Sequence, residues 1–178
     1  HPVTLEDETS ASQMRELLSS LSILKETKII FTMPNADADG RIIIDLIKDF
    51  CKNNPHSKFY KSLGQEKYLS CINQVDFVIG NSSSGIIEVP TFKKGTINIG
   101  DRQKGRLQAK SIVNCRPIKK EITQAIKLIY TKEFQESLSK VKNPYGNGGA
   151  SEKIIKVIEE IKLNSILKKK FYEFSKKF

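Results

Sequence analysis

One run near the middle of the chain, residues 76–88, most constrains the fold. Its first part, Asp76-Phe77-Val78-Ile79, is apolar enough for a buried strand, and the small residues of Gly80-Asn81-Ser82-Ser83-Ser84-Gly85 are typical of a tight turn. Ile86 and Ile87 then open a short helix. A buried strand that turns directly into a helix is a building unit of α/β domains.

The serine turn is also a candidate anion site. The first N–H groups of a helix lack intrahelical partners and carry partial positive charge. Serine hydroxyls and bare glycine backbone allow a diphosphate to approach. Glu88, one to two turns into the helix, is placed to reach the hydroxyls of a ribose. The pattern is neither the Walker loop nor the dinucleotide fingerprint, and an ordinary N-capped turn is the alternative.

A second motif follows at residues 95–106. Gly95-Thr96-Ile97-Asn98-Ile99 predicts another short buried strand, and a basic, glycine-flanked loop comes after it. In open α/β sheets, ligands gather beyond the carboxyl ends of the strands. Arg102 and Arg106 lie in this loop, and an arginine fork suits phosphate or carboxylate equally well. A solvated surface pair is the alternative.

The rest of the chain alternates between helical and strand patterns, which predicts a parallel sheet with helices on both faces. A chain of 178 residues suits a single domain spanning 1–178. The expected helices cover residues 8–24, 42–50, 65–73, 119–130, 151–161 and 165–174, and the expected strands 28–32, 58–63, 111–115 and the runs around Val78 and Ile97.

Composition excludes several classes of function. The formal charge is +10, but the lysines are scattered, and no zinc-finger or RNA-recognition pattern accompanies them. We therefore expect no nucleic-acid partner, and no segment is apolar and long enough to predict a membrane partner. The cysteines, Cys51, Cys71 and Cys115, have neither metal nor disulfide spacing, which favours free thiols in the cytoplasm.

The motifs at 80–88 and 98–106 together resemble the hydrolysing UDP-N-acetylglucosamine 2-epimerases, in the branch that feeds sialic acid and related nonulosonic acid synthesis. Residues 1–4, 33–37 and 143–148 fit the same pattern in the same order. The resemblance implies a Rossmann-like domain, the C-terminal half of a glycosyltransferase-B-like fold. It also implies that residues 164–178 form a terminal crossover helix, that the N-terminal half of the enzyme is a partner, and that the intact enzyme is a homo-oligomer.

The resemblance assigns nucleotide contacts to six residues: Tyr68, Ser82, Ser83, Gly85, Glu88 and Arg102. Ser82 and Ser83 match positions that contact the diphosphate, and Gly85 keeps that approach open. Glu88 matches the acid that holds the ribose hydroxyls; its alternative role is to offset the helix dipole. Tyr68 matches an aromatic position beside the uracil, although core packing would explain it as well.

Other residues are expected to line the cleft. His1 matches a histidine near the phosphates and sugar, where it would act catalytically by hydrogen bonding to the departing diphosphate. Asn35 and Asp37 match a cleft-lining loop, and Arg102 is expected to close the same wall. The family chemistry requires no metal and no cofactor, and we predict neither.

The resemblance implies a reaction that converts UDP-N-acetylglucosamine to N-acetylmannosamine and UDP by elimination and water addition. The acid and base would come from the missing half, so the chain is expected to bind UDP or a UDP-sugar yet be inactive alone. The alternatives are a nucleotide-sugar-dependent glycosyltransferase domain, a related epimerase for a UDP- or GDP-linked diacetamido-trideoxyhexose, and a non-catalytic binding module.

Overall fold

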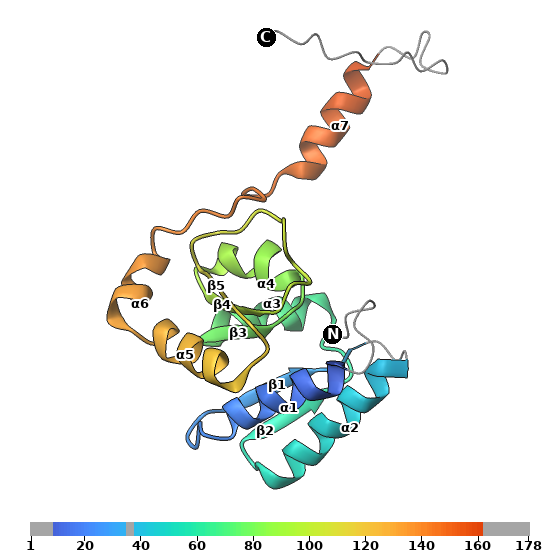
Figure 1. Cartoon of the computed structure of the whole chain (residues 1–178). Coiled ribbons are helices and arrows are strands. Elements are labelled where there is room, and N and C mark those ends of the chain that lie inside the picture. The colour runs from blue at the N-terminus through green and yellow to red at the C-terminus, as the bar shows by residue number, and fades with distance from the viewer. Residues whose placement is uncertain (1–8, 35–37, 162–178) are drawn as a thin grey trace, which may run out of the picture. The chain divides into compact units, whose positions relative to one another are not determined.

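The computed structural model of the chain describes residues 9–34 and 38–161. Helices and strands alternate along it, as the sequence predicts (Figure 1). In chain order the elements are α1 (Thr9–Leu21), β1 (Ile29–Thr32), α2 (Ala38–Asn53), β2 (Ser57–Tyr60), α3 (Gly64–Gln74), β3 (Phe77–Gly80), α4 (Ser84–Ile87), the 3₁₀ turn η1 (Val89–Phe92), β4 (Gly95–Ile99), β5 (Ile112–Cys115), α5 (Lys119–Ile129), α6 (Lys132–Leu138) and α7 (Ala150–Glu160).

All three strand pairings are parallel, which confirms the predicted α/β class. Within the described residues the strands form two hydrogen-bonded groups, β1-β2 and β3-β4-β5, rather than the one sheet that the sequence predicts. The two groups nevertheless share a core. Side chains from β1, such as Phe31, and from β3, such as Ile79, pack against the same buried cluster.

That cluster forms where α5 covers β4. Ile97 and Ile99 of β4 pack with Leu21 of α1 and with one face of α5. Every residue of β4 is buried, as expected for the central strand of a parallel sheet covered on both faces. The α5 face repeats at intervals of three and four residues, which places its apolar side chains on one side: Ile122, Ala125, Ile126 and Ile129.

The sequence predicts most elements but misses α6. This helix has only seven residues, so it lacks the long apolar period that identifies a helix in sequence. Its start is marked by Thr131, whose hydroxyl accepts a hydrogen bond from the Phe134 N–H at 3.3 Å. Elsewhere the errors are at the ends: α1 stops at Leu21, and β2 stops at Tyr60. The helix expected at 165–174 lies outside the described residues.

By its contacts the chain divides into two units, one ending at Gly146 and one beginning at Asn147. The second unit contains α7, which matches the predicted helix at 151–161. Its apolar residues Ile154, Val157 and Ile158 recur at helical spacing, and Lys156 pairs with Glu160 at 3.8 Å. The prediction of one domain over the whole chain stays a prediction.

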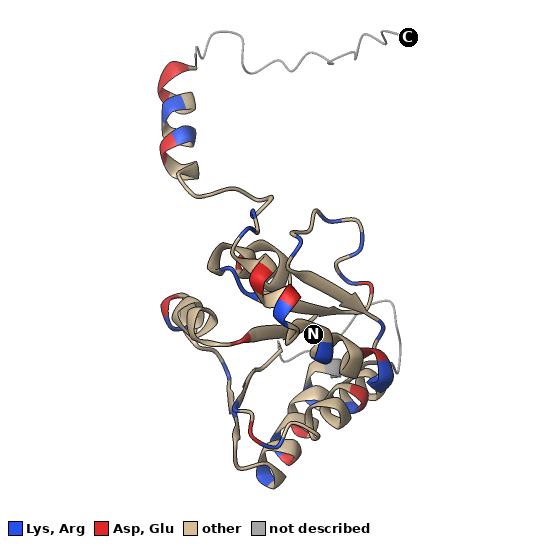
Figure 2. Cartoon of the chain, turned by 90° about the vertical axis from the view of Figure 1, so that its left-hand side faces the viewer, with Lys and Arg blue, Asp and Glu red and all other residues tan. Residues whose placement is uncertain are grey.

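Charges are mixed over the described surface. Figure 2 shows blue and red residues interspersed along the helices, whereas the loop after β4 is mostly blue. No helix in the described ranges combines the length and apolarity needed to cross a membrane. Over the same ranges, no three His, Cys, Asp or Glu side chains come together as a metal site.

Gly85 is needed for the packing of α4 on β4. A Cβ atom at this residue would lie 2.7 Å from Thr96 Cγ2, well inside normal contact. The Thr96 hydroxyl also donates a hydrogen bond to the Gly85 carbonyl at 2.7 Å. The glycine thus has a structural reason that is independent of any ligand.

We therefore expect Gly85→Ala to destabilise the chain by about 1–3 kcal/mol, the usual cost of overpacking a core. Adding Thr96→Ser should recover much of this loss, because serine keeps the hydroxyl and removes the clashing methyl. Chemical unfolding monitored by circular dichroism measures both. The exposed α5 substitution Gln124→Ala serves as control, and a Gly85→Ala variant as stable as the wild type would contradict the packing role.

Candidate functional site

The serine turn begins where β3 ends. Gly80 has φ of 149°, a backbone conformation that favours glycine. The chain then runs through Ser82 and Ser83 into α4, where the Ser83 carbonyl accepts hydrogen bonds from Ile86 N at 3.0 Å and Ile87 N at 2.9 Å. Ser82 and Ser83 are half-buried, so neither is sealed in the core.

Helix α4 is short, as the sequence predicts. It has four residues, and η1 continues the chain with tighter turns. Few aligned peptides contribute to its dipole, so hydroxyls and neighbouring cations must supply most of the attraction for an anion. Glu88 lies at the junction of α4 and η1, and its N–H bonds to the Ser84 carbonyl at 2.9 Å.

Tyr68, Ser84 and Glu88 lie close together beside this turn. The Tyr68 hydroxyl lies 2.6 Å from Ser84 Oγ. Burial raises the pKa of Tyr68, the Ser84 hydrogen bond lowers it, and the nearby Glu88 carboxylate raises it further. The structure thus brings two predicted site residues together and adds Ser84, which the sequence marks only as the third serine of the run.

The basic loop after β4 closes on the serine turn. Arg102 Nη1 donates to the Asn81 carbonyl at 3.0 Å, and Gln103 Nε2 donates to the same oxygen at 2.8 Å. The Arg102 side chain is exposed, whereas Gln103 is buried. The two loops that the sequence predicts to share a site therefore meet, and Gln103 is a contact that the sequence analysis missed.

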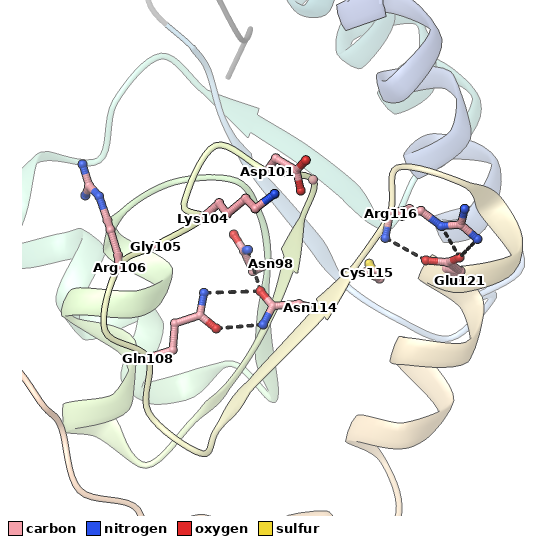
Figure 3. A pocket seen from close by; sticks show the side chains of 11 residues that line it. Asn98, Asp101, Lys104, Gly105, Arg106, Gln108, Asn114, Cys115, Arg116 and Glu121 are labelled. Atoms are coloured by element: carbon pink, nitrogen blue, oxygen red, sulfur yellow. Dashed lines mark hydrogen bonds and ion pairs between the residues drawn. The ribbon is translucent and has the colours of Figure 1, made fainter.

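A separate cavity of about 510 Å³ lies between the basic loop, β5 and the start of α5 (Figure 3). A row of amides crosses it: Asn98 Nδ2 donates to Asn114 Oδ1 at 2.8 Å, and Asn114 Nδ2 donates to Gln108 Oε1 at 2.7 Å. Lys104 and Arg106 also line it. The serines of the turn and Glu88 are not among its lining residues.

The far wall of this cavity is an ion pair. Arg116 hydrogen bonds to Glu121, which lowers the pKa of Glu121 and raises that of Arg116. Beside it, burial followed by the Glu121 charge raises the pKa of Cys115 to about 11. Cys115 is therefore a protonated thiol at neutral pH and not a nucleophile.

Asn143 and Tyr145, in the motif at residues 143–148, connect this part of the chain to α4, to η1 and to the basic loop. Its Nδ2 donates to the Ile87 carbonyl at 2.8 Å and to Thr91 Oγ1 at 2.7 Å, so it holds the chain on both sides of Glu88. Its Oδ1 accepts from Tyr145 N at 3.0 Å. The Tyr145 hydroxyl in turn donates to the Leu107 carbonyl at 3.0 Å, at the end of the basic loop.

His1, Asn35 and Asp37 lie outside the described residues, so their roles stay predictions. Among the described residues, the nucleotide-contact candidates come from three places: Tyr68 from α3, Ser82, Ser83, Gly85 and Glu88 from the segment after β3, and Arg102 from the loop after β4.

Parallel strands alternating with helices place the chain in the class of Rossmann-like α/β domains. Comparison with known families gives the narrower assignment. A family model described as UDP-N-acetylglucosamine 2-epimerase matches residues 1–159. The chain belongs to this family, as the sequence motifs predict.

Curated relatives agree with this family. The chain is 41% identical over 175 residues to the GDP/UDP-N,N'-diacetylbacillosamine 2-epimerase (hydrolyzing) of Campylobacter jejuni, covering 97% of this chain and 45% of the relative. It is 38% identical to the polysialic acid biosynthesis protein P7 of Escherichia coli, covering 97% and 44%. The chain thus spans less than half the length of these relatives, which is consistent with the predicted C-terminal half of a two-domain enzyme.

Solved structures share the fold. A co-structure of Staphylococcus aureus MnaA with UDP aligns with a TM-score of 0.70 at 17% identity, covering 89% of this chain and 43% of that one. The Methanocaldococcus jannaschii UDP-GlcNAc 2-epimerase in complex with UDP-GlcNAc and UDP aligns with a TM-score of 0.62, also at 17% identity, covering 86% and 41%. Both likenesses support the glycosyltransferase-B-like half-fold.

The Asn143 contacts generate a prediction. Asn143→Ala removes the donor to the Ile87 carbonyl and to Thr91, so we expect a stability loss of about 1–3 kcal/mol. Tyr145→Phe removes one exposed hydrogen bond and should cost about 0.5–1.5 kcal/mol. Thermal and denaturant unfolding measure both, with the exposed Asn73→Ala of α3 as control. Equal stability of Asn143→Ala and wild type would show that the Asn143 hydrogen bonds to α4 and η1 do not stabilise the fold.

Proposed function

We propose that this chain is the nucleotide-diphosphate-binding half of a hydrolysing UDP-N-acetylglucosamine 2-epimerase. One observation carries the proposal: in a chain of this family, the Arg102 loop meets the serine turn at the carboxyl ends of β3 and β4, and Glu88 follows at the end of α4. Because the chain spans less than half the length of its relatives, the complete reaction would need residues beyond it.

Each side chain has a chemical role in this proposal. The hydroxyls of Ser82 and Ser83 would donate to the diphosphate, and the exposed Arg102 would supply a planar charged donor for its oxygens. Glu88 would accept hydrogen bonds from the two ribose hydroxyls. The Tyr68 hydroxyl already bonds Ser84, so the ring would contact the base from a fixed position.

In the proposed reaction, this chain and the other half of the enzyme have different roles. A base in the other half would take the proton from C2 of the sugar as the C1–oxygen bond breaks, and the bonding electrons would leave with the nucleotide diphosphate. Water would then add across the C1–C2 double bond, with hydroxyl at C1 and hydrogen on the opposite face of C2. Donors already aimed at the leaving diphosphate would stabilise its growing charge, and His1 would add one more.

The sugar and base are the finer part of the proposal. UDP-N-acetylglucosamine is the first candidate, since the fold neighbours were solved with UDP or UDP-GlcNAc. A diacetamido-trideoxyhexose linked to UDP or GDP is the second, favoured by the name of the relative that is 41% identical. In either case the product would feed sialic acid or nonulosonic acid synthesis, and the intact enzyme would assemble as a homo-oligomer. Family membership favours both over a glycosyltransferase.

Calorimetry of this chain with UDP and GDP tests the nucleotide site. We expect Ser82→Ala combined with Glu88→Ala to weaken binding by about 1–3 kcal/mol for each charged or buried hydrogen bond lost. The pair Ser137→Ala and Glu133→Ala on α6 removes the same chemical groups far along the chain and should leave binding unchanged. Equal affinity of the double variant and the wild type would exclude the serine turn as the site.

The reaction is tested with the full-length parent enzyme. Incubated with UDP-N-acetylglucosamine and no acceptor, it should release UDP and free N-acetylmannosamine in equal amounts, which proton NMR of the products measures. In ²H₂O the product should carry deuterium at C2, because elimination exchanges that proton with solvent. Sugar transfer to an added acceptor without free sugar would support the transferase instead, and turnover only with a diacetamido sugar would reassign the substrate.

A further inference from the structure

Gln103 is a buried amide within an otherwise exposed, charged loop. Its neighbours Arg102 and Lys104 are exposed, whereas the Gln103 side chain retains only 2% of its accessible surface. Its Nε2 donates to the carbonyl of Asn81 at 2.8 Å, across 22 positions in sequence. The side chain therefore points from the basic loop into the backbone of the serine turn.

The other end of this amide has an unmet hydrogen-bonding requirement. Gln103 Oε1 is buried and has no hydrogen-bond partner among the described residues. A buried acceptor without a partner costs free energy, so an apolar side chain of similar shape would suit stability as well or better. We therefore attribute the presence of an amide at this position to the hydrogen bond that its Nε2 donates to the Asn81 carbonyl.

The Asn81 carbonyl controls the direction of the next N–H group. A peptide unit is planar and trans, so its C=O and the following N–H point in opposite directions. Fixing the Asn81 oxygen thus fixes the N–H of Ser82, the first serine of the turn. Two donors hold that oxygen, the exposed Arg102 at 3.0 Å and the buried Gln103 at 2.8 Å.

We propose that Gln103 is a positioning residue that holds the serine turn in its diphosphate-binding geometry and leaves Arg102 free to engage the ligand. An exposed guanidinium has several N–H donors and can turn towards a phosphate. Gln103 is enclosed and keeps the Asn81 carbonyl satisfied when Arg102 moves. The inference rests on the proposed function, since it concerns how the same diphosphate site is held in its binding geometry.

Gln103→Met separates positioning from packing. Methionine has nearly the same length and removes both the donor and the unpaired acceptor, so the melting temperature should stay the same or rise. UDP affinity should nevertheless fall about tenfold, the equivalent of one lost hydrogen bond in the site. Amide hydrogen exchange at Gly85–Ile87, whose N–H groups bond the carbonyls of Ser82 and Ser83, should become faster in the free chain. If methionine does not fit, the smaller Gln103→Leu gives the same comparison.

Two further variants complete the test. Gln108→Met alters an amide of the same loop that bonds Asn114 instead of Asn81, and it should change neither UDP affinity nor exchange at the serine turn. Arg102→Ala should weaken UDP binding while exchange at Gly85–Ile87 stays near wild type, because Gln103 still holds the Asn81 carbonyl.

The outcomes distinguish the two proposals. If the wild-type chain and the parent enzyme fail to bind any nucleotide, the proposed function is wrong, and the exchange data still decide whether Gln103 orders the turn. Exchange at Gly85–Ile87 that is unchanged in Gln103→Met overturns the positioning role. So does a melting temperature that falls while UDP affinity stays at the wild-type value, because that result describes a packing residue alone.

Discussion

The complete burial of β4 is the constraint on which the rest of the structure depends. All five of its residues are buried, including the polar Thr96 and Asn98, and the neighbouring elements lie close. At Gly95 a Cβ would lie 2.6 Å from Ile129 Cδ1, and at Gly85 one would clash with Thr96. Because β3 and β4 are parallel neighbours, their carboxyl ends lie at one edge of the sheet. The serine turn and the basic loop therefore meet there.

Short backbone contacts then hold that edge together. The Asn81 carbonyl accepts hydrogen bonds from the basic loop, and Asn143 donates hydrogen bonds to the chain on both sides of Glu88. The side-chain amides of Gln103 and Asn143 hold the backbone in place, while Ser82 and Ser83 are half-buried and Arg102 is exposed.

Much of the fold was predictable because its patterns are local. The α5 face repeats at helical spacing, and the short apolar runs at β3 and β4 lead into turn residues. The misses have equally specific reasons. Helix α6 is too short for its periodicity to be read. The short helix α4 is predicted, but the 3₁₀ turn η1 that follows it is not, because four residues are too few to show a periodic pattern. The sequence also does not show that β1-β2 and β3-β4-β5 form separate hydrogen-bonded groups, because pairing depends on how the strands are placed in the folded chain.

The sequence by itself determined the α/β class, the family and the two motifs that form the candidate site, because these depend on residue type, order and spacing. Only the tertiary structure decided which atoms meet. It revealed that Gly85 packs against Thr96, that Tyr68 bonds Ser84, and that a glutamine in a charged loop is buried against Asn81. Such contacts join residues 11 to 22 positions apart, so their geometry follows from how the core packs and not from any local pattern.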